Sequence, residues 1–161
     1  MKDGLLSHIL VAVSGSGASV NAARYAIVMA KLYRCKLTGV YVVDTATLKQ
    51  LSLSKIFLAE ESDDYATSLE ENGRRYLAFV EELAKARGVQ LDKVLRFGNV
   101  STEIMTTAQE KGADLIILGG WEKDRDPRDI VGQTHREIQV NSKVSVLVVK
   151  NRDIEQIYRR S

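Results

Sequence analysis

The first residues that could carry chemistry form the turn SGSG at residues 14–17, inside the stretch VAVSGSGAS. Small residues let backbone amides converge on an anion, and the N-terminus of a following helix adds a favourable partial charge. A short glycine motif alone is weak evidence, because the same letters suit an ordinary turn between a strand and a helix. A phosphate cradle and a plain connection are therefore two interpretations of this turn.

A second glycine-bearing loop, residues 119–132, contains the charged stretch EKDRDPRD, with four acids against three bases. A loop that attracts polyphosphate usually has the opposite balance. At an effective dielectric near 20, a like charge about 5 Å from a phosphate costs roughly 3 kcal/mol, which weakens binding about a hundredfold. Glu122 in this loop therefore predicts that a triphosphate binds weakly or not at all.

Other reactive side chains form no catalytic set. His8 and His135 lack a nucleophile and a carboxylate at recognisable spacing, so we expect solvated or capping histidines. Cys35 has no CxxC or metal-ligand pattern around it, and a packing role is expected. With no positioned base or metal-binding pair, we expect no enzyme, no ATP hydrolysis and no metal site.

Hydrophobic periodicity predicts the elements that position these residues. Apolar runs predict strands at 8–13, 36–44, 113–120 and 144–150, and alternation of apolar and polar residues predicts one at 89–98. Helical patterns predict helices from Ser19, as N-cap, to about Arg34, from about 61 to 87 before Gly88, from Asn99, as cap, to Gly112, and between the last two strands. Residues 45–61 show no clean period. The order predicts a parallel sheet with helices on both faces and ligands at the carboxyl ends of its strands.

Composition limits the class of protein. A chain of 161 residues with 45% hydrophobic residues is typical of one domain with one core. Its 23 lysines and arginines nearly cancel 21 aspartates and glutamates, so bulk charge favours neither nucleic acid nor acidic membranes. A single cysteine, no leader pattern and no apolar run of about 20 residues predict a soluble cytoplasmic protein.

Four stretches, ILVAVSGSGAS, GVYVVD, GADLIILGG and VSVLVVK, occur in the order and spacing of the universal stress protein family, which the chain resembles throughout. The resemblance implies a domain at 1–150, followed by a C-terminal tail at 151–161. It implies a single-domain α/β fold: an open parallel five-stranded sheet of order 3-2-1-4-5 with helices on both faces, Rossmann-like and similar to adenine nucleotide alpha hydrolases. The tail has two interpretations, a frayed basic end or a short amphipathic helix with Ile154, Ile157 and Tyr158 on one side.

The resemblance also implies a homodimer formed through the last strand. An apolar strand at the edge of a sheet invites pairing, which favours an interface through Val144, Val146 and Val148.

Members of the family that bind ATP have an Asp after the first strand and a Gly-x2-Gly-x9-Gly-Ser/Thr signature after the fourth. Gly119 and Gly132 match its first and third glycines, whereas Glu122 replaces the second. Ser14 stands in place of the Asp, and Val42 matches a position that lines the adenine pocket. Gln133 stands in place of the Ser/Thr, with Thr134 beside it. The resemblance thus implies six nucleotide-binding positions: Ser14, Val42, Gly119, Gly132, Gln133 and Thr134.

The expected function is that of a cytoplasmic stress-response or regulatory module, homodimeric, with unidentified protein partners and a degenerate nucleotide site that requires no cofactor. The alternative is a switch in which ATP, with Mg²⁺, biases the loop 119–132. A remote alternative is a PP-loop ATP pyrophosphatase, because SGSGAS resembles the SGGxDS loop of those enzymes; here Ala18 replaces its aspartate and Ser16 its second glycine. Trp121 has three interpretations: it caps the nucleotide cleft, plugs it or faces a partner.

Overall fold

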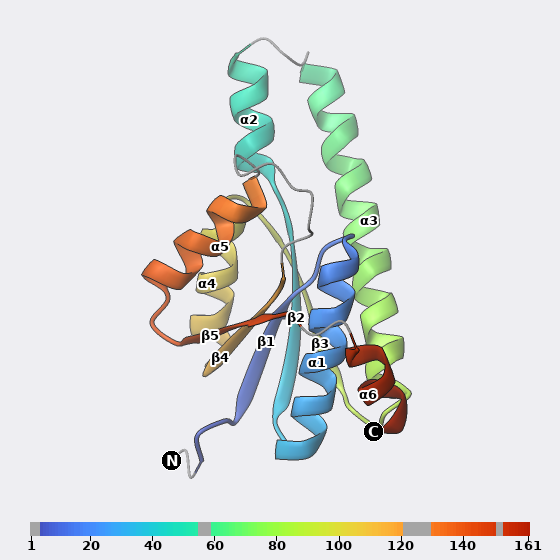
Figure 1. Cartoon of the computed structure of the whole chain (residues 1–161). Helices are drawn as coiled ribbons and strands as arrows, with labels where there is room; N and C mark the ends of the chain where they lie inside the picture. The colour runs from blue at the N-terminus through green and yellow to red at the C-terminus, as the bar shows by residue number, and fades with distance from the viewer. Residues whose placement is uncertain (1–3, 55–58, 121–129, 151–152) are drawn as a thin grey trace.

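The computed structural model describes residues 4–54, 59–120, 130–150 and 153–161. In these ranges the chain forms one parallel sheet of order β3-β2-β1-β4-β5, as predicted (Figure 1). Its strands are β1 (His8–Ala12), β2 (Lys36–Val43), β3 (Leu91–Phe97), β4 (Leu115–Gly119) and β5 (Ser145–Val149). The helices are α1 (Gly17–Tyr33), α2 (Thr45–Leu53), α3 (Ala59–Lys85), α4 (Val100–Lys111), α5 (Ile130–Asn141) and α6 (Ile154–Arg160).

Helices cover both faces of the sheet (Figure 1). On one face, Ile9 and Val11 of β1 belong to the core cluster that includes residues of α1, α3 and α6. On the other, Leu10 belongs to the cluster that includes residues of α4 and α5. Burial on both faces explains why β1 and β4 are continuous apolar runs, whereas β3, at the edge of the sheet, alternates and is mostly exposed or half-buried. No helix in these ranges is long and apolar enough to cross a bilayer.

The start of α1 differs from the prediction. Ser16, not Ser19, is the N-cap: its backbone is extended, and its hydroxyl oxygen accepts a hydrogen bond from the Ser19 amide at 3.1 Å. The Ser19 side chain instead accepts from the Ser14 amide at 2.6 Å. Three serines within six residues can each supply a capping hydroxyl, and only the backbone conformation selects among them.

Residues 45–53, for which no element was predicted, form α2. Asp44 caps this helix, with its carboxylate accepting from the Thr47 amide at 3.0 Å and from the Thr47 hydroxyl at 2.7 Å. Leu48 is the one buried residue of α2. A helix that buries so little needs no apolar stripe, which is why no helical period is visible in its sequence. Together with the first half of α3, α2 projects beyond the carboxyl ends of the strands (Figure 1).

Gly73 explains how the long helix α3 lies so close to the sheet. A Cβ at this position would lie 2.4 Å from Cδ1 of Tyr41, a β2 residue. The bare backbone therefore allows the tyrosine ring to contact α3 directly. One turn later the Tyr76 ring lies 6.2 Å from that of Tyr41, measured between centroids.

The other predicted helix ends are confirmed. Asn99 caps α4 by accepting from the Thr102 amide at 3.1 Å. Gly112 ends α4 with φ 68°, and Gly88 follows α3 with φ 73°, both in the left-handed region that glycine tolerates best.

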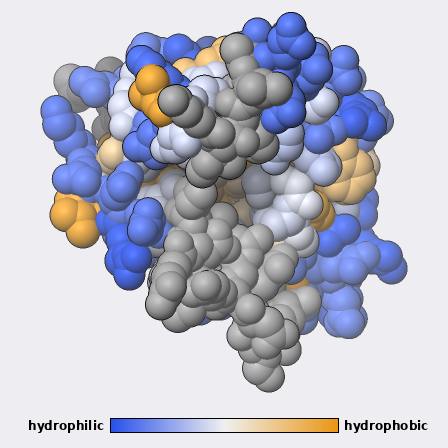
Figure 2. All heavy atoms as spheres, turned by 90° about the horizontal axis from the view of Figure 1, so that it is seen from above, coloured by the Kyte–Doolittle hydropathy of each residue, from blue (hydrophilic) through white to orange (hydrophobic). Residues whose placement is uncertain are grey.

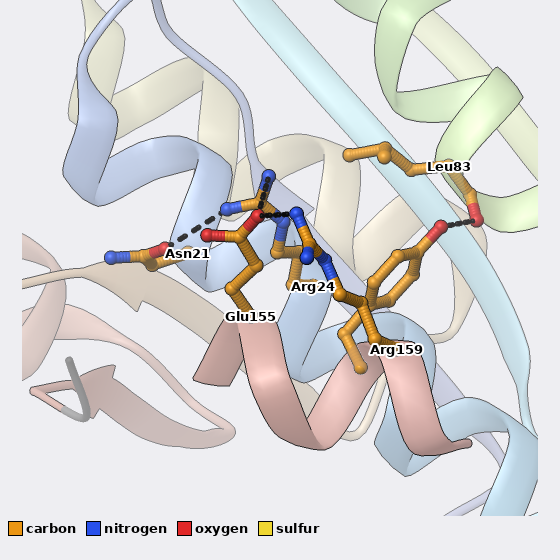
Figure 3. Close-up of polar contacts among 6 residues, drawn as sticks. Asn21, Arg24, Leu83, Glu155 and Arg159 are labelled. Atoms are coloured by element: carbon orange, nitrogen blue, oxygen red, sulfur yellow. Dashed lines mark hydrogen bonds and ion pairs between the residues drawn. The ribbon is translucent and has the colours of Figure 1, made fainter. Parts of the chain in front are cut away.

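The tail is a helix, α6, that packs against the chain's own α1 and α3. Tyr158 is only 6% exposed, and its hydroxyl donates to the Leu83 carbonyl of α3 at 2.6 Å. The Arg87 guanidinium lies 4.6 Å from the centre of the Tyr158 ring, and its Nε donates to the Tyr158 carbonyl at 2.8 Å. Glu155 lies between two arginines in Figure 3, 2.7 Å from Arg159 and 4.0 Å from Arg24 of α1.

Candidate functional site

A cavity of about 260 Å³ lies where ligands are expected in a parallel sheet, beyond the carboxyl ends of β1, β2 and β4. The turn at residues 14–17 forms part of its wall, and residues of α1, α4 and α5 complete it. Most of the lining side chains are apolar, among them Val40, Ile104 and Leu118. Seen from above this edge, hydrophilic side chains gather around the periphery of the face (Figure 2).

Four of the residues predicted to bind a nucleotide line this cavity: Ser14, Val42, Gly119 and Thr134. The other two do not lie as expected. Gln133 is exposed and is absent from the lining, whereas Gly132 is the third residue of α5 rather than part of a loop before it. The helix begins earlier than the spacing of the glycines suggested.

Trp121 and Glu122 lie outside the described residues. The predictions that depend on them remain predictions.

Gly119 and Gly120 are required by packing. A Cβ on Gly119 would lie 2.7 Å from the carbonyl carbon and oxygen of Ala18. A Cβ on Gly120 would lie 2.4 Å from the carbonyl oxygen of Val149. Because these neighbours are backbone atoms that cannot rotate away, the end of β4 needs glycine whether or not a ligand is bound.

Three amides of the turn and the start of α1 bond to serine hydroxyls. Those of Ser14, Ser16 and Ser19 donate to serine hydroxyl oxygens, at 2.6, 3.4 and 3.1 Å respectively. Gly15 fits beneath α3, since a Cβ there would lie 2.7 Å from the Tyr76 hydroxyl oxygen. These contacts engage some of the amides that a phosphate cradle would use.

Asp44 is a site residue that sequence reasoning missed. It lines the cavity from the end of β2 while it caps α2. Among the described lining residues it is the one carboxylate, and none is lysine or arginine. In dinucleotide-binding folds, an acidic residue after the second strand binds the hydroxyls of the sugar. An acid at the end of the second predicted strand is therefore the sequence signal from which Asp44 could have been predicted.

The expectation of a solvated side chain is wrong for His135. His135 is 7% exposed and lines the cavity, because it lies one turn before buried Ile138 on the inner face of α5. His8 is half-buried, with Nε2 2.7 Å from the Thr38 hydroxyl oxygen. Desolvation lowers the pKa of His8, and the nearby charge of Lys36 acts in the same direction.

Cys35 packs against the core cluster that includes α1, as expected. Burial raises the pKa of its thiol, which disfavours the reactive thiolate. Within the described ranges no group of three or more His, Cys, Asp or Glu residues is arranged to hold a metal ion.

The comparisons with known proteins agree on one family. A family model described as the universal stress protein family matches residues 6–150. The universal stress protein MJ0531 of Methanocaldococcus jannaschii is 31% identical over 149 residues, which cover 92% of this chain and 84% of that protein. A crystal structure of a universal stress protein family member from Burkholderia pseudomallei superposes with a TM-score of 0.73 at 23% identity, covering 93% of this chain and all of that one.

Two further solved structures of similar fold were determined with nucleotides. One is a universal stress protein in complex with cAMP, with a TM-score of 0.64 at 19% identity, covering 89% of this chain and 96% of that one. The other is the universal stress protein from Archaeoglobus fulgidus in complex with dAMP, with a TM-score of 0.64 at 16% identity, covering 91% of this chain and all of that one. At these identities the likeness establishes a shared fold.

Proposed function

The chain belongs to the universal stress protein family, and from that premise we propose that it is a stress-response regulatory module whose cavity takes an adenine mononucleotide and holds a triphosphate only weakly. The observation that carries this proposal is the cavity itself, at the edge of the sheet where such folds bind ligands. The cAMP and dAMP complexes of proteins with this fold support the choice of ligand class.

The size and lining of the cavity favour a nucleoside. At about 260 Å³ it is slightly smaller than most ligand pockets, which have volumes of roughly 300 to 1,000 Å³, so it suits a small ligand. Apolar walls from Val40, Val42 and Leu118 suit the faces of a purine base. The Asp44 carboxylate, at the end of β2, suits the hydroxyls of a sugar.

Electrostatics disfavour additional phosphates. Among the described residues the lining offers Asp44 but neither lysine nor arginine, so its field repels an anion. The amides of Ser14, Ser16 and Ser19 already have hydroxyl partners, and a phosphate would have to displace them. The second and third phosphates of ATP should therefore contribute little affinity.

Calorimetric titrations with AMP and with Mg-ATP test this function. We expect AMP to bind and Mg-ATP to bind no tighter than AMP. Val42→Phe should weaken AMP at least about tenfold, because the added ring fills the cavity, and 1.4 kcal/mol is within the range for overpacking. Val140→Phe is the matched control: it makes the same change at a valine that is 80% exposed and outside the cavity lining.

Three outcomes would contradict the proposal. The first is that AMP does not bind, and the second is that Val42→Phe and Val140→Phe behave alike. The third is that Mg-ATP binds at least tenfold tighter than AMP, a difference of about 1.4 kcal/mol, which would favour an ATP-responsive switch.

We also propose that the module is a homodimer that pairs through β5. This strand is hydrogen-bonded to β4 on one side and ends the sheet formed by the described residues, in which its other side is an open edge. Val144, Val146 and Val148 are all half-buried and pack toward the α4 and α5 side of the core.

Val146→Lys should convert a dimer to a monomer, because it places a charge beside the pairing edge. Size-exclusion chromatography with light scattering measures the mass, and thermal unfolding confirms that the variant is folded. Leu53→Lys, at an α2 residue that is 74% exposed, is the control and should stay dimeric. A folded Val146→Lys variant that keeps the mass of a dimer would exclude this interface.

A further inference from the structure

A groove at the amino-terminal edge of the sheet, opposite the cavity, is rich in cations. It measures about 1020 Å³, and its charged lining comprises Lys31, Arg34, Lys36, Lys93 and Lys111 with Asp92 and Glu110. Five cations against two carboxylates leave an excess of positive charge. We call this surface the basic groove.

Three of these cations have no ion-pair partner in the described part of the chain. Lys93 pairs with Glu81 at 3.2 Å, and Lys111 pairs with Asp92 at 3.0 Å. In contrast, Lys31, Arg34 and Lys36 are exposed, and no carboxylate in the described part of the chain lies within ion-pair distance of them. The helix dipole favours a cation such as Lys31 in the last turn of α1. The dipole does not account for Arg34, which follows the helix, or for Lys36 on β2.

Arg34 occupies a backbone conformation that usually favours glycine. Its φ is 54° and its ψ is 47°, in the left-handed region. After α3 and α4, Gly88 and Gly112 adopt the equivalent conformation. An arginine at the end of α1 thus keeps a charge on the basic groove where glycine would fit the backbone with less strain.

The complementary charge lies at the other end of the molecule. The first half of α3, residues 59–73 (AEESDDYATSLEENG), contains six carboxylates and no lysine or arginine. Glu60, Asp63 and Asp64 are exposed, and their spacing of three and four residues places them on one side of the helix. We call this segment the acidic helix; it projects beyond the carboxyl edge of the sheet, away from the basic groove (Figure 1).

Both surfaces also expose large apolar side chains. In the last turn of α1, beside the basic groove, Leu32 is 71% exposed and Tyr33 is 62% exposed. Near the acidic helix, Leu53 of α2 is 74% exposed, and Tyr65 within the helix is 51% exposed. Apolar contacts surrounded by charged pairs are typical of protein interfaces.

We propose that the basic groove receives the acidic helix of a second copy of this chain. The two surfaces lie at opposite ends of one molecule, so they can meet only between molecules. The contact is head-to-tail: each copy inserts its acidic helix into one neighbour and accepts that of another, which builds open chains of molecules. The net charge of only +2 conceals this segregation. The free edge of β5 takes no part, so the contact is independent of the proposed dimer.

Sedimentation velocity at two ionic strengths tests the contact on the full chain. Near 20 mM salt, where charges act over about 20 Å, the average mass should rise with protein concentration; near 500 mM salt it should fall back to that of the basic unit. A dimer paired through β5 would set the mass of that unit and would persist at both salt concentrations. The salt-dependent increase is therefore the signal of the head-to-tail contact.

Two charge-reversed variants identify the surfaces. The groove variant carries Lys31→Glu, Arg34→Glu and Lys36→Glu, and the helix variant carries Glu60→Lys, Asp63→Lys and Asp64→Lys. Each alone should lose the salt-dependent increase, because both of its surfaces then have the same sign. An equimolar mixture should recover it, because each variant's helix now matches the other's groove. Thermal unfolding verifies that both are folded.

Arg34→Gly separates assembly from folding. This variant removes one groove charge and relieves the strained backbone, so the association should weaken at least threefold while the melting temperature does not fall. The proposal is overturned if the wild type has one mass at both salt concentrations, if either reversed variant still associates alone, or if the mixture fails to associate.

Discussion

Gly119→Ala is expected to destabilise the chain by about 3 kcal/mol, which lowers the melting temperature by roughly 6 to 12 °C. The new methyl group would lie 2.7 Å from the Ala18 carbonyl and 3.0 Å from the Ser19 amide nitrogen. Both belong to the backbone of α1, so relief requires that the helix and β4 move apart. Because Gly119 and Ala18 both line the cavity, AMP binding should weaken as well.

Gly17→Ala is the matched control. A Cβ on Gly17 meets nothing within 4 Å, and this residue is the first of α1. Alanine should leave stability unchanged or raise it by up to about 1 kcal/mol, since it restricts the unfolded chain and favours the helix. Differential scanning calorimetry of the two variants measures the contrast. Equal melting temperatures would refute the view that Gly119 is required by close backbone packing.

Tyr158→Ala should cost about 4 kcal/mol, the magnitude typical of removing a buried aromatic side chain. The change removes the ring that lies beneath Arg87 and the hydroxyl that donates to Leu83. Without them α6 retains only Ile154 as a fully buried anchor. Chemical denaturation monitored by circular dichroism gives the free energy of unfolding.

Tyr158→Phe divides this cost. It keeps the ring and its contact with Arg87 but loses the hydrogen bond to Leu83, so we expect about 1 kcal/mol. The difference between the two variants measures the ring itself. If Tyr158→Ala costs no more than Tyr158→Phe, then packing of α6 does not stabilise the domain and the helix is a separate unit of folding.

The sheet could be predicted because its signals are strong and local. Apolar runs such as LIILG are long enough for strands buried on both faces, and Asn99 and Gly112 mark the ends of α4 clearly. In contrast, α2 escaped prediction because its first turn depends on Asp44, and a helix with one buried residue has little periodicity. Ser16 and Ser19 are equivalent in the sequence, and only the backbone conformation distinguishes them.

The candidate site was predictable where position along the strands determines it. Ser14, Val42 and Gly119 follow or end strands, so the topology of the sheet brings them together. Gln133 and Gly132 depend on where α5 begins, and the spacing of glycines carries no information about that. The burial of His135 was not predicted because it depends on the helix face that His135 shares with Ile138, which requires the start and rotation of α5.

Asp44 connects two parts of the molecule through one carboxylate. Its oxygens hold the first turn of α2, and the same side chain faces the cavity. A ligand that bonds to this carboxylate competes with Thr47 for it. Ligand binding in the cavity and the order of α2 are therefore thermodynamically linked, and a change in either one must change the other. The order of α2, which lies near the acidic helix, would then depend on whether a ligand occupies the cavity.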